Sequence, residues 1–517
     1  AHNNLGMIFQ KQGRLEEAEA SFRHALRIDS NDAKTHNNQG IVLQELGRLN
    51  EADAHFQLAL QIDPDNASTL SNRGNLLRHM GRLEEAELCY QKSLELAQDD
   101  LNTLNGLGMI LQDLGRFEQA EACYRRILEL KPDNAGVMSN LGMALLNLGR
   151  SDESEVCFRQ ALQIKPDHAL LHSNLLYFLT LSAKLDGKAL FAEHVGFGQR
   201  FESPLRNDWP KHTQIRNPEK SLKIGFVSPD LYNHAVASFI EPVLLHLSGK
   251  PQLILHAYYN NFVNDDITQR LQNYFHHWNS IADLSDVELA ERIRADGIDI
   301  LIDLTGHTAK NRLLVFARKP APVQVSWIGY PGTTGLNSMD YFLADRYLLP
   351  PGQFDDQFIE KIVRLPANAP FQPFAASPPI NLLPALAKGY MTFGSFNRPN
   401  KLSRNVITLW SRLLRALPDA RMLLGGMPDT GNYESLIMWF AEEGISRNRL
   451  DIHPRSGMEQ YLTLHHQVDI CLDTFPYNGG TTTHHALWMG VPTLTLSGQS
   501  MAGRVGSAIL SRGGLPA

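Results

Sequence analysis

Residues 74–91, GNLLRHMGRLEEAELCYQ, decide the first half of the fold because the same pattern returns at residues 108–125 as GMILQDLGRFEQAEACYR. The two stretches lie 34 residues apart. Glycine–arginine steps recur with this spacing along the first third of the chain, at Gly13–Arg14, Gly47–Arg48, Gly81–Arg82, Gly115–Arg116 and Gly149–Arg150. The chain therefore opens with an array of repeated structural units.

A 34-residue period with aligned glycines and aromatic residues is typical of the tetratricopeptide repeat, a pair of antiparallel helices. The glycine–arginine step marks the turn between the two helices, and a D-P-D-N type segment ends the second helix. One unit cannot bury its apolar face alone, so the units must stack into a solenoid with a concave groove. We expect this superhelix to span residues 1–180.

One polar position of the repeat is occupied by asparagine, at Asn4, Asn38, Asn72, Asn140 and Asn174, and Gly106 interrupts the series. Asparagine is a mediocre helix former, so its recurrence on one helix face needs a reason. Its amide can clasp the backbone of an extended peptide without reading side chains, which favours a peptide-binding groove. The alternative is a hydrogen bond between neighbouring repeats.

The sequence pattern changes after the repeats. Residues 181–221 resemble capping helices followed by a polar linker that runs to about Pro218. Short apolar strands then alternate with helices over residues 222–370 and again over residues 389–517, with a proline-rich linker at residues 371–388. This alternation predicts two Rossmann-like α/β domains with a cleft between them, following the α-solenoid. Ligands of such sheets bind beyond the carboxyl ends of the strands.

Composition excludes several classes of protein. A formal net charge of −7 and a pI near 6.3 disfavour a nucleic-acid binder. The chain has no apolar stretch long enough to span a membrane, and no secretory leader, so we expect a cytoplasmic protein. Because the chain starts inside a repeat and ends at GGLPA, we expect terminal segments to lie outside it.

The segment TFPYNGGTTTHHALWMG, residues 474–490, carries the strongest signal for a ligand. We expect a helix to begin at about His484, preceded by Thr481, Thr482 and Thr483. Hydroxyl and free N–H groups at a helix N-terminus form an anion site suited to a diphosphate. The alternative is an ordinary helix cap with spare threonines.

Two further segments place charged groups just after predicted strands. In GSFNRPNKLS, Lys401 and its neighbour Arg398 could neutralise a departing diphosphate, or Lys401 could be a solvated loop residue. In FVSPDLYNHAVASF, Asp230 and His234 lie four residues apart, so either could act as a base or orient an acceptor. A lone histidine is more often structural.

Glycine-containing loops follow two other strands, in GHTAKNR around His307 and in GYPGTTG around Gly329 and Pro331, and they allow close approach of a sugar. The usual phosphate loops of NTPases and dehydrogenases are missing. The paired histidines are adjacent in sequence and therefore point to different helix faces, so no metal site is expected.

Five motifs together resemble the O-linked N-acetylglucosamine transferase family, in which tetratricopeptide repeats precede a GT-B glycosyltransferase. The chain is also similar to the plant SPINDLY-type protein O-fucosyltransferases. The resemblance covers nearly the whole chain, and the compact form without a large insert between the catalytic halves suggests a bacterial homologue. The motifs are VSPDLYNH, DILIDLTGHTAKNR, PAPVQVSWIGYPGTTG, FGSFNRPNKLS and CLDTFPYNGGTTTHHALWMGVP.

The resemblance implies an inverting, metal-independent enzyme without a cofactor, which transfers a sugar from a nucleotide donor to serine or threonine of a protein held by the repeats. UDP-N-acetylglucosamine is the first choice of donor and GDP-fucose the second. A catalytically silent nucleotide-binding scaffold is the alternative of another class.

By motif, Lys401 would contact the diphosphate, Thr481 and Thr482 the pyrophosphate and sugar, and Gly329 and Pro331 the sugar pocket. His234 would lie beside the sugar and acceptor, with Asp230 as a proton acceptor. Three positions depart from the animal-type pattern: Gly480 replaces a histidine, Arg398 a glutamine and His485 an acidic residue near the ribose.

Overall fold

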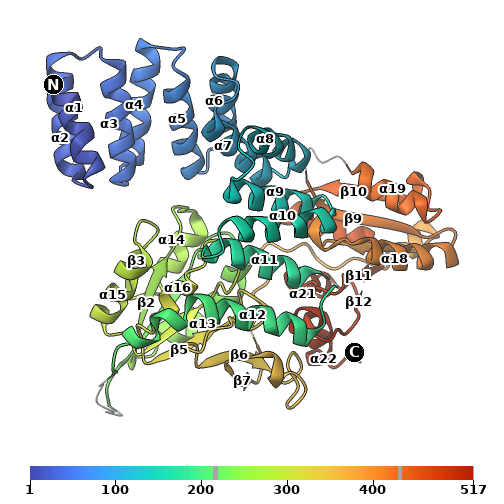
Figure 1. The fold of residues 1–517 in the computed structure, drawn as a ribbon. Helices are drawn as coiled ribbons and strands as arrows, with labels where there is room; N and C mark the ends of the chain where they lie inside the picture. Colours follow the sequence, from blue (N-terminus) through green and yellow to red (C-terminus); the bar gives the residue numbers. More distant parts are fainter. Residues whose placement is uncertain (183, 213–218, 369, 429–432, 516–517) are drawn as a thin grey trace. The chain divides into compact units, whose positions relative to one another are not determined.

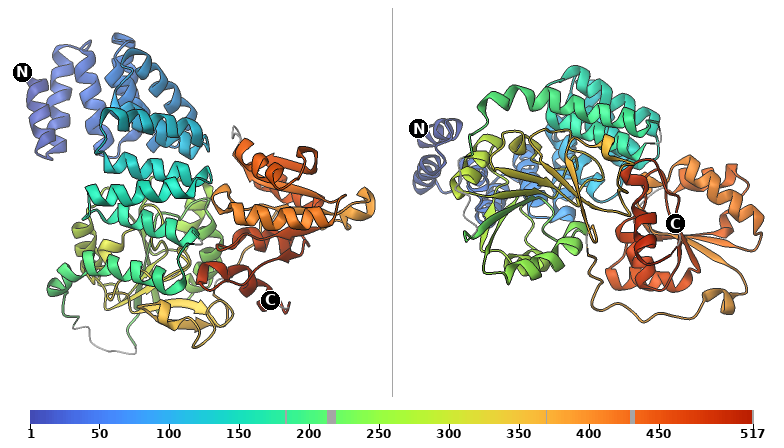
Figure 2. Two further views of the ribbon diagram at one scale, coloured as in Figure 1. Left: turned by 45° about the vertical axis from the view of Figure 1, so that its right-hand side comes forward. Right: turned by 90° about the horizontal axis from the view of Figure 1, so that it is seen from below.

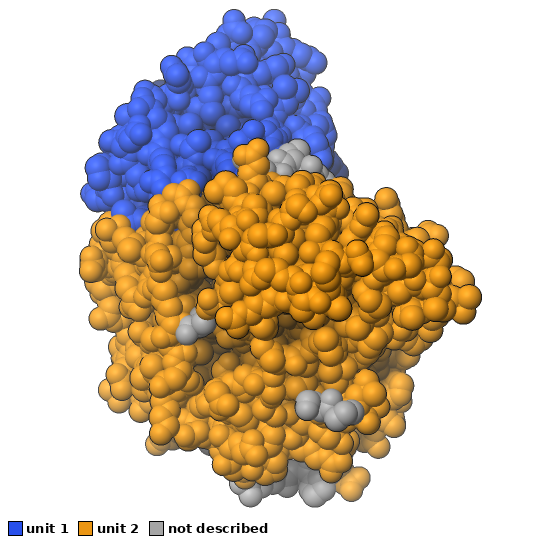
Figure 3. Space-filling view, turned by 90° about the vertical axis from the view of Figure 1, so that its right-hand side faces the viewer, with its two compact units in different colours: residues 1–144 blue, residues 145–517 orange. Residues whose placement is uncertain are grey.

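The computed structural model describes residues 1–182, 184–212, 219–368, 370–428 and 433–515. Parts of the predicted linker at 181–221, namely residues 183 and 213–218, lie outside this description, as does residue 369. The chain forms two compact units, residues 1–144 and residues 145–517 (Figure 3). The boundary between the units lies inside the repeats, whereas the repeat pattern of the sequence continues to residue 180.

The first unit is a row of antiparallel helix pairs (Figure 1). Packing follows the repeat: a Cβ atom added at Gly40 would lie 2.8 Å from the ring of Phe56, so the first helix of the pair needs glycine to approach the second. In chain order the helices are α1 His2–Lys11, α2 Leu15–Ile28, α3 Ala33–Glu45, α4 Leu49–Ile62, α5 Ala67–His79, α6 Leu83–Leu96, α7 Leu101–Asp113, α8 Phe117–Leu130 and α9 Ala135–Asn147, the last of which crosses into the second unit.

The glycine–arginine step makes the turn between the two helices of each pair, as the sequence predicts. Gly47 has a φ of +75°, a left-handed conformation that costs glycine little, and the amide of Arg48 donates to the carbonyl of Leu43. Each first helix therefore ends at a glycine cap, and the next helix starts at once.

The second unit begins with three more helices, α10 Ser151–Ile164, α11 Ala169–Leu181 and α12 Gly187–Phe201. Leu176 of α11 and Phe197 of α12 are fully buried in the same apolar core as Tyr258 and Leu301 of the sheet that follows. The last solenoid helices therefore share a core with the α/β part of the chain, which explains why they belong to its compact unit.

The first sheet of the second unit has seven parallel strands in the order β3-β2-β1-β4-β5-β6-β7, and the second has five in the order β10-β9-β8-β11-β12. In both sheets the order reverses beside the first strand, which is the arrangement of doubly wound nucleotide-binding folds. Figure 2 shows the two sheets with their helices, and the linker running from one to the other.

The elements of the first sheet are β1 Leu222–Ser228, α13 Ala235–Ser248, β2 Leu253–Tyr259, α14 Asp266–Gln272, β3 His277–Ser280, α15 Asp286–Asp296, β4 Ile300–Asp303, α16 Leu313–Phe316, β5 Val323–Ser326, β6 Tyr341–Asp345 and β7 Lys361–Leu365. Those of the second are α17 Pro384–Lys388, β8 Thr392–Ser395, the short 3-10 helix η3 Pro399–Lys401, α18 Arg404–Ala416, β9 Arg421–Met427, α19 Glu434–Glu442, β10 Leu450–Pro454, α20 Met458–Leu464, β11 Ile470–Leu472, α21 Thr481–Trp488, β12 Thr493–Leu494 and α22 Val505–Arg512.

The proline-rich linker is anchored rather than free. The indole of Trp327 donates to the carbonyl of Asn368, the amide of Gln372 donates to the carbonyl of Ser238, and α17 forms within the linker's last residues. Within the described ranges, the structure contains no helix whose length and apolar character would let it span a bilayer.

Candidate active site

The predicted site residues of the two sheets lie at the carboxyl ends of strands, and those after β1, β8 and β11 lie next to a reversal of strand order. Asp230 and His234 follow β1, and Gly329 and Pro331 follow β5. In the second sheet, Arg398 and Lys401 follow β8, and the threonine run follows β11. These ends are where doubly wound sheets bind ligands, because the loops of adjacent strands diverge there.

Lys401 is the last residue of the short helix η3, and its ammonium group contacts the loop after β11, the strand that lies beside β8 in the sheet. Its Nζ donates to the carbonyl of Asn478 at 2.8 Å and lies 4.2 Å from the centre of the Tyr477 ring. Burial lowers the pKa of Lys401 to about 7; Asp473 opposes this shift and Arg398 adds to it. A half-buried ammonium group with a carbonyl, a ring face and few other partners is prepared to receive an anion.

The loop from Asp473 to Gly480 is folded around one buried carboxylate. Asp473 accepts hydrogen bonds from the amides of Thr474 and Gly479, at 2.8 and 2.6 Å, and from the hydroxyl of Thr495 at 2.8 Å. Burial nevertheless raises the pKa of Asp473. This carboxylate therefore fixes the backbone that leads into the threonine run, a role that the sequence analysis did not assign to it.

The threonine run lies inside a helix, not before it. The prediction that the helix begins at about His484 is wrong, since α21 starts at Thr481 and Gly480 is its N-cap, with no side chain capping it. Glycine supplies no capping oxygen, so the first amides of α21 have no side-chain acceptor. The three threonines form the first turn, where hydroxyl and amide groups point toward the same end of the helix.

The three threonine hydroxyls are not equivalent. Thr483 is buried and its hydroxyl donates to the carbonyl of Gly479 at 3.0 Å. The hydroxyl of Thr482 lies 3.3 Å from Oδ1 of Asn397, in the loop after β8. Thr481 and Thr482 are half-buried, so they are the two that can meet a ligand at the helix end.

An aromatic cluster lies beside the same helix, and only one of its members, His485, was a predicted site residue. The imidazole of His485 is 3.3 Å from the hydroxyl of Tyr461, and burial lowers its pKa to about 4. Phe371 of the linker stacks on His484 with ring centres 4.8 Å apart and meets His485 edge-on at 5.3 Å. Tyr461 and Phe371 carry no motif of their own; only the fold brings them to α21.

Asp230 and His234 face each other after β1, with 3.7 Å between Oδ1 and Nδ1. His234 is the N-cap of α13, and its Nδ1 accepts from the amide of Val236. Burial lowers the pKa of His234 to about 4, with a smaller effect of Arg398, so the ring is neutral. Since Nδ1 accepts, the proton of the neutral ring is on Nε2, which is therefore a donor.

Burial has the opposite effect on the carboxyl group of Asp230. It raises the pKa of Asp230 to about 6, while the charges of Lys310 and Arg398 lower it and that of Asp303 raises it. Asp230 is thus ionised at pH 7 but binds a proton much more readily than an exposed aspartate. Such a group is suited to accept a proton during a reaction at neutral pH.

Arg398 connects the two halves of the site electrostatically. It is exposed, and its charge acts on Asp230 and His234 of the first sheet as well as on Lys401 of the second. The candidate proton acceptor and the candidate diphosphate site therefore lie within range of one cation.

The loop after β5 contains a strained backbone. Ile328 has a φ of +66°, and the amide of Gly329 donates to the carbonyl of Trp327 at 2.8 Å, which makes a γ-turn centred on a β-branched residue. A Cβ atom at Gly329 would lie 2.0 Å from the carbonyl oxygen of Leu304. Gly329 thus allows the loops after β4 and β5 to touch, and half-buried Pro331 follows in the same loop. Strain of this kind is concentrated at functional sites.

His307, in the loop after β4, does not face a ligand. It is fully buried, with Nδ1 3.0 Å from the Ser173 hydroxyl and Nε2 2.9 Å from the carbonyl of Thr334. Its loop is therefore held by the solenoid's last helices. The described part of the chain holds no group of three or more His, Cys, Asp or Glu side chains placed to bind a metal ion.

The asparagines of the first unit form hydrogen bonds from repeat to repeat. The amide of Asn38 donates to Asn3 at 3.0 Å, that of Asn72 to Asn37 at 3.0 Å, and that of Asn140 to Asn105 at 3.2 Å. The hydrogen bond between neighbouring repeats, which the sequence analysis gave as the alternative to peptide binding, is therefore present. Each bond uses one of the two N–H groups of an amide, so peptide binding by the others stays a prediction. Asn174 lies on α11 of the second unit.

Comparison with known proteins places this geometry in a family. A model of glycosyl transferase family 41 matches residues 170–371 and 383–517, and a tetratricopeptide repeat model matches residues 1–65, 31–99, 65–133 and 99–167. A solved structure of a mutant of Thermobaculum terrenum O-GlcNAc transferase has a TM-score of 0.81 and 34% identity, and the match covers 87% of this chain and 86% of that one.

Curated relatives agree with this assignment. The SPINDLY protein of Arabidopsis thaliana, named a probable UDP-N-acetylglucosamine–peptide N-acetylglucosaminyltransferase, is 36% identical over 341 residues, which are 64% of this chain and 37% of that protein. The Caenorhabditis elegans UDP-N-acetylglucosamine–peptide N-acetylglucosaminyltransferase is 24% identical over 424 residues, 58% of this chain and 36% of that protein. The match thus spans little more than a third of these relatives' length. The resemblance inferred from the motifs is confirmed: the chain belongs to glycosyl transferase family 41, with tetratricopeptide repeats before its catalytic domains.

Proposed function

We propose that this chain is an inverting, metal-independent protein O-glycosyltransferase that transfers N-acetylglucosamine from UDP-N-acetylglucosamine to serine or threonine of proteins held by the repeats. One observation carries the proposal: a half-buried lysine and a helix start without a side-chain cap lie in one half of the site, and an ionised, readily protonated aspartate lies in the other. Family membership and the named activities of the relatives support it.

The second sheet supplies the groups for the leaving diphosphate. As the bond between the sugar's anomeric carbon and the β-phosphate oxygen breaks, negative charge grows on the nucleoside diphosphate. The ammonium of Lys401 and the first amides and hydroxyls of α21, at Thr481 and Thr482, are placed to neutralise that charge. Arg398 adds a positive field from the loop after β8.

The first sheet supplies the group for the acceptor. The serine or threonine hydroxyl attacks the anomeric carbon from the face opposite the leaving group, and its proton passes to a base. Asp230 is ionised at pH 7, whereas neutral His234 offers Nε2–H as a hydrogen-bond donor. Asp230 therefore takes the proton, and His234 orients the sugar or the acceptor.

GDP-fucose is the second candidate donor. The departures at Arg398, Gly480 and His485 all lie in the half of the site built by the second sheet, which is proposed to hold the nucleotide, so they bear on the choice of donor. The nucleobase of the donor would contact the aromatic cluster of Phe371, Tyr461 and His485. This cluster offers ring faces and a hydroxyl group to either uracil or guanine.

Calorimetric titration with UDP and with GDP, each with EDTA present, tests the donor. We expect UDP to bind more tightly than GDP, and Lys401→Ala to weaken binding by at least tenfold because it removes the cation at the diphosphate. Lys388→Ala is the matched control, since Lys388 is an exposed lysine of the same half that donates only to the carbonyl of Gln467 among the described residues.

Transfer assays decide between an enzyme and a scaffold. Labelled UDP-N-acetylglucosamine and GDP-fucose are each incubated with a library of serine- and threonine-containing peptides. If N-acetylglucosamine is transferred from the UDP donor and Lys401→Ala abolishes this transfer, the proposal is supported. If only fucose is transferred, the donor is GDP-fucose. Nucleotide binding without transfer from either donor supports the scaffold.

A further inference from the structure

Two neighbouring repeats of the first unit depart from the others at three positions that lie together, two on α5 and one on α7. The position of Arg78 is glutamine in the repeats on either side, at Gln10, Gln44 and Gln112. The position of Asn75 is apolar in the other repeats, at Met7, Ile41, Met109 and Met143. Gly106 interrupts the asparagine series. Three differences that cluster at one place in a regular array indicate a specific local structure rather than random variation among the repeats.

Tyr90 explains the missing asparagine. A Cβ atom at Gly106 would lie 2.6 Å from the Tyr90 ring and 2.7 Å from its hydroxyl, so no side chain fits there. The hydroxyl of Tyr90 donates to Oδ1 of Asn75 at 2.7 Å. In the next repeat, Tyr124 donates instead to Gln112, and Asn140 keeps its place in the series. The tyrosine, the new asparagine and the glycine therefore form one packed arrangement.

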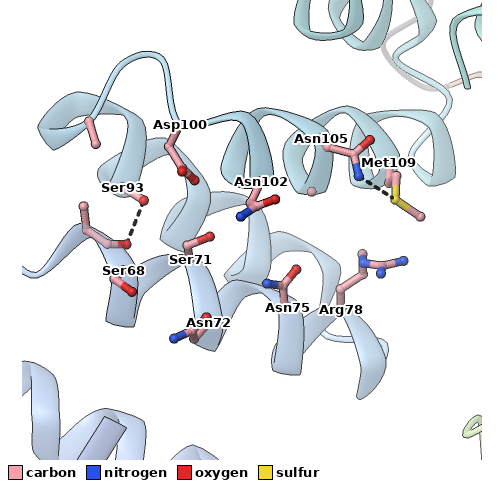
Figure 4. Close-up of a pocket in the computed structure, with 13 residues that line it drawn as sticks. Ser68, Ser71, Asn72, Asn75, Arg78, Ser93, Asp100, Asn102, Asn105 and Met109 are labelled. Carbon is pink, nitrogen blue, oxygen red and sulfur yellow. Dashed lines mark hydrogen bonds between the residues drawn. The ribbon is translucent and has the colours of Figure 1, made fainter. Parts of the chain in front are cut away.

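The result is a pocket of about 470 Å³ between α5 and α7 (Figure 4). Asn75 and Arg78 of α5 lie opposite Asn105 and Met109 of α7 in this view. Asn72 also lines the pocket. Because Asn72 and Asn105 belong to the asparagine pairs that join the repeats, the pocket is continuous with the surface proposed to hold a polypeptide backbone.

Arg78 is the cation among the residues that line this pocket. Its Nε is buried without a hydrogen-bond partner, and the described residues give it no carboxylate within ion-pair distance. Nearby arginines of the same unit are paired, Arg73 and Arg82 with Asp53 and Arg116 with Glu87. A buried Nε–H without an acceptor is unfavourable, and a bound anion would supply one.

The one acidic residue that lines the pocket is already engaged. Asp100 is the N-cap of α7, where it accepts from the amide of Thr103 at 2.8 Å and from its hydroxyl. Its carboxylate therefore serves the helix start and does not neutralise Arg78. Tyr90 is fully buried behind the lining, where burial raises its pKa to about 12 and Arg78 opposes that shift, so its hydroxyl is uncharged and stays with Asn75.

We propose that this pocket, the Arg78 pocket, binds the carboxylate of an aspartate or glutamate side chain of the polypeptide held in the repeat groove, and so selects acceptors with an acidic residue at one fixed position. The proposal rests on the proposed function, because it assumes that the groove holds the acceptor. The guanidinium binds the carboxylate, and Asn75 on the same helix and Asn105 on the opposite helix offer amide groups.

The test uses the whole chain and fluorescent peptides of extended, neutral sequence in which glutamate or glutamine is placed at each position in turn. We expect glutamate at one position to tighten binding about three- to tenfold over glutamine in the wild type. In Arg78→Gln, which installs the residue of the neighbouring repeats, the two peptides should bind alike. Arg78→Lys should keep part of the preference.

Arg126→Gln is the control for charge, because it removes one arginine from an exposed surface of α8, where Arg126 pairs with Asp99 and Glu129. It should leave the glutamate preference unchanged. Equal binding of all glutamate and glutamine peptides to the wild type, a preference that survives Arg78→Gln, or no binding of any peptide overturns the Arg78 pocket. Sugar transfer, assayed separately, decides the proposed function independently.

Discussion

The hydroxyl of Tyr330, in the loop after β5, lies 2.8 Å from Nε2 of His194 on helix α12. Both side chains are buried. Because Nδ1 of His194 donates to the carbonyl of Leu190 at 2.7 Å, the neutral ring has its lone pair on Nε2, and Tyr330 is the donor. The same hydroxyl contacts Thr180 of α11. The solenoid's last helices thus hold the strained loop that carries Gly329 and Pro331.

Tyr330→Phe should destabilise the chain by about 1–3 kcal/mol, because it leaves Nε2 of His194 buried without a donor. Thermal denaturation measures the effect as a lowered midpoint of the second unit. Tyr347→Phe is the control, since the hydroxyl of Tyr347 contacts only Arg346 among the described residues and the midpoint should not change. Equal midpoints for Tyr330→Phe and wild type would show that the bond contributes nothing.

The repeats and both α/β sheets follow from the sequence, because their signals are periodic or local. The 34-residue period fixes the helix pairs, and apolar runs predict strands such as β1 and β9. Strand β3, His277–Ser280, has no such signal, because it is polar and its residues are at most half-buried. Its place depends on pairing with β2, which is a tertiary effect.

The residues of the candidate site also fall into two groups, those that sequence motifs reveal and those that only the fold brings to the site. Lys401, the threonines and Asp230 lie beside glycines or strand ends, where sequence motifs are dense. Tyr461 and Phe371 were missed because each sits in a segment without such a motif and reaches α21 only through the fold. The start of α21 was misplaced because threonines were assigned to the loop, although Gly480 can serve as an N-cap.

Binding of a nucleoside diphosphate should take up a proton at Lys401. Burial lowers its pKa to about 7, and the bound diphosphate favours the charged form and raises that pKa. At pH 8 the free lysine is mostly neutral, so binding should take up close to one proton, and the affinity should fall as pH rises above 7. Calorimetric titration of UDP at pH 8 in two buffers of different ionisation enthalpy measures this uptake.

Lys401→Arg is the control for that measurement. Arginine stays protonated throughout this pH range, so the variant should bind without proton uptake. If Lys401→Arg takes up as many protons as the wild type, another group on the protein or the nucleotide is responsible.

The asparagine pairs should matter for long acceptors and not for the donor. Replacing Asn38, Asn72 and Asn140 together by alanine removes the donating amides of three repeat-to-repeat bonds and the groups proposed to hold the peptide backbone. We expect KM for an extended polypeptide acceptor to rise at least tenfold, while KM for the nucleotide sugar stays constant. Asn31→Ala, an exposed turn residue, is the matched control. Circular dichroism establishes that the repeats remain folded.

Asp230→Asn should abolish transfer at neutral pH and yet stabilise the fold. As a base, Asp230 must be ionised, so wild-type transfer should fall as pH drops through about 6, with the slope of a single proton.

Because the folded pKa is raised above the unfolded value near 4, the folded state binds the proton more tightly, and ionisation above pH 6 costs stability. The asparagine variant lacks that cost, so its free energy of unfolding at pH 7.5 should exceed that of the wild type by about 1–3 kcal/mol, and the difference should vanish near pH 4. Urea denaturation at the two pH values and initial rates from pH 5 to 8 measure both effects. If the transfer rate of His234→Asn is lower but still falls as pH drops through about 6, the titrating group is Asp230. If this fall in rate moves to another pH in His234→Asn, the histidine accepts the proton.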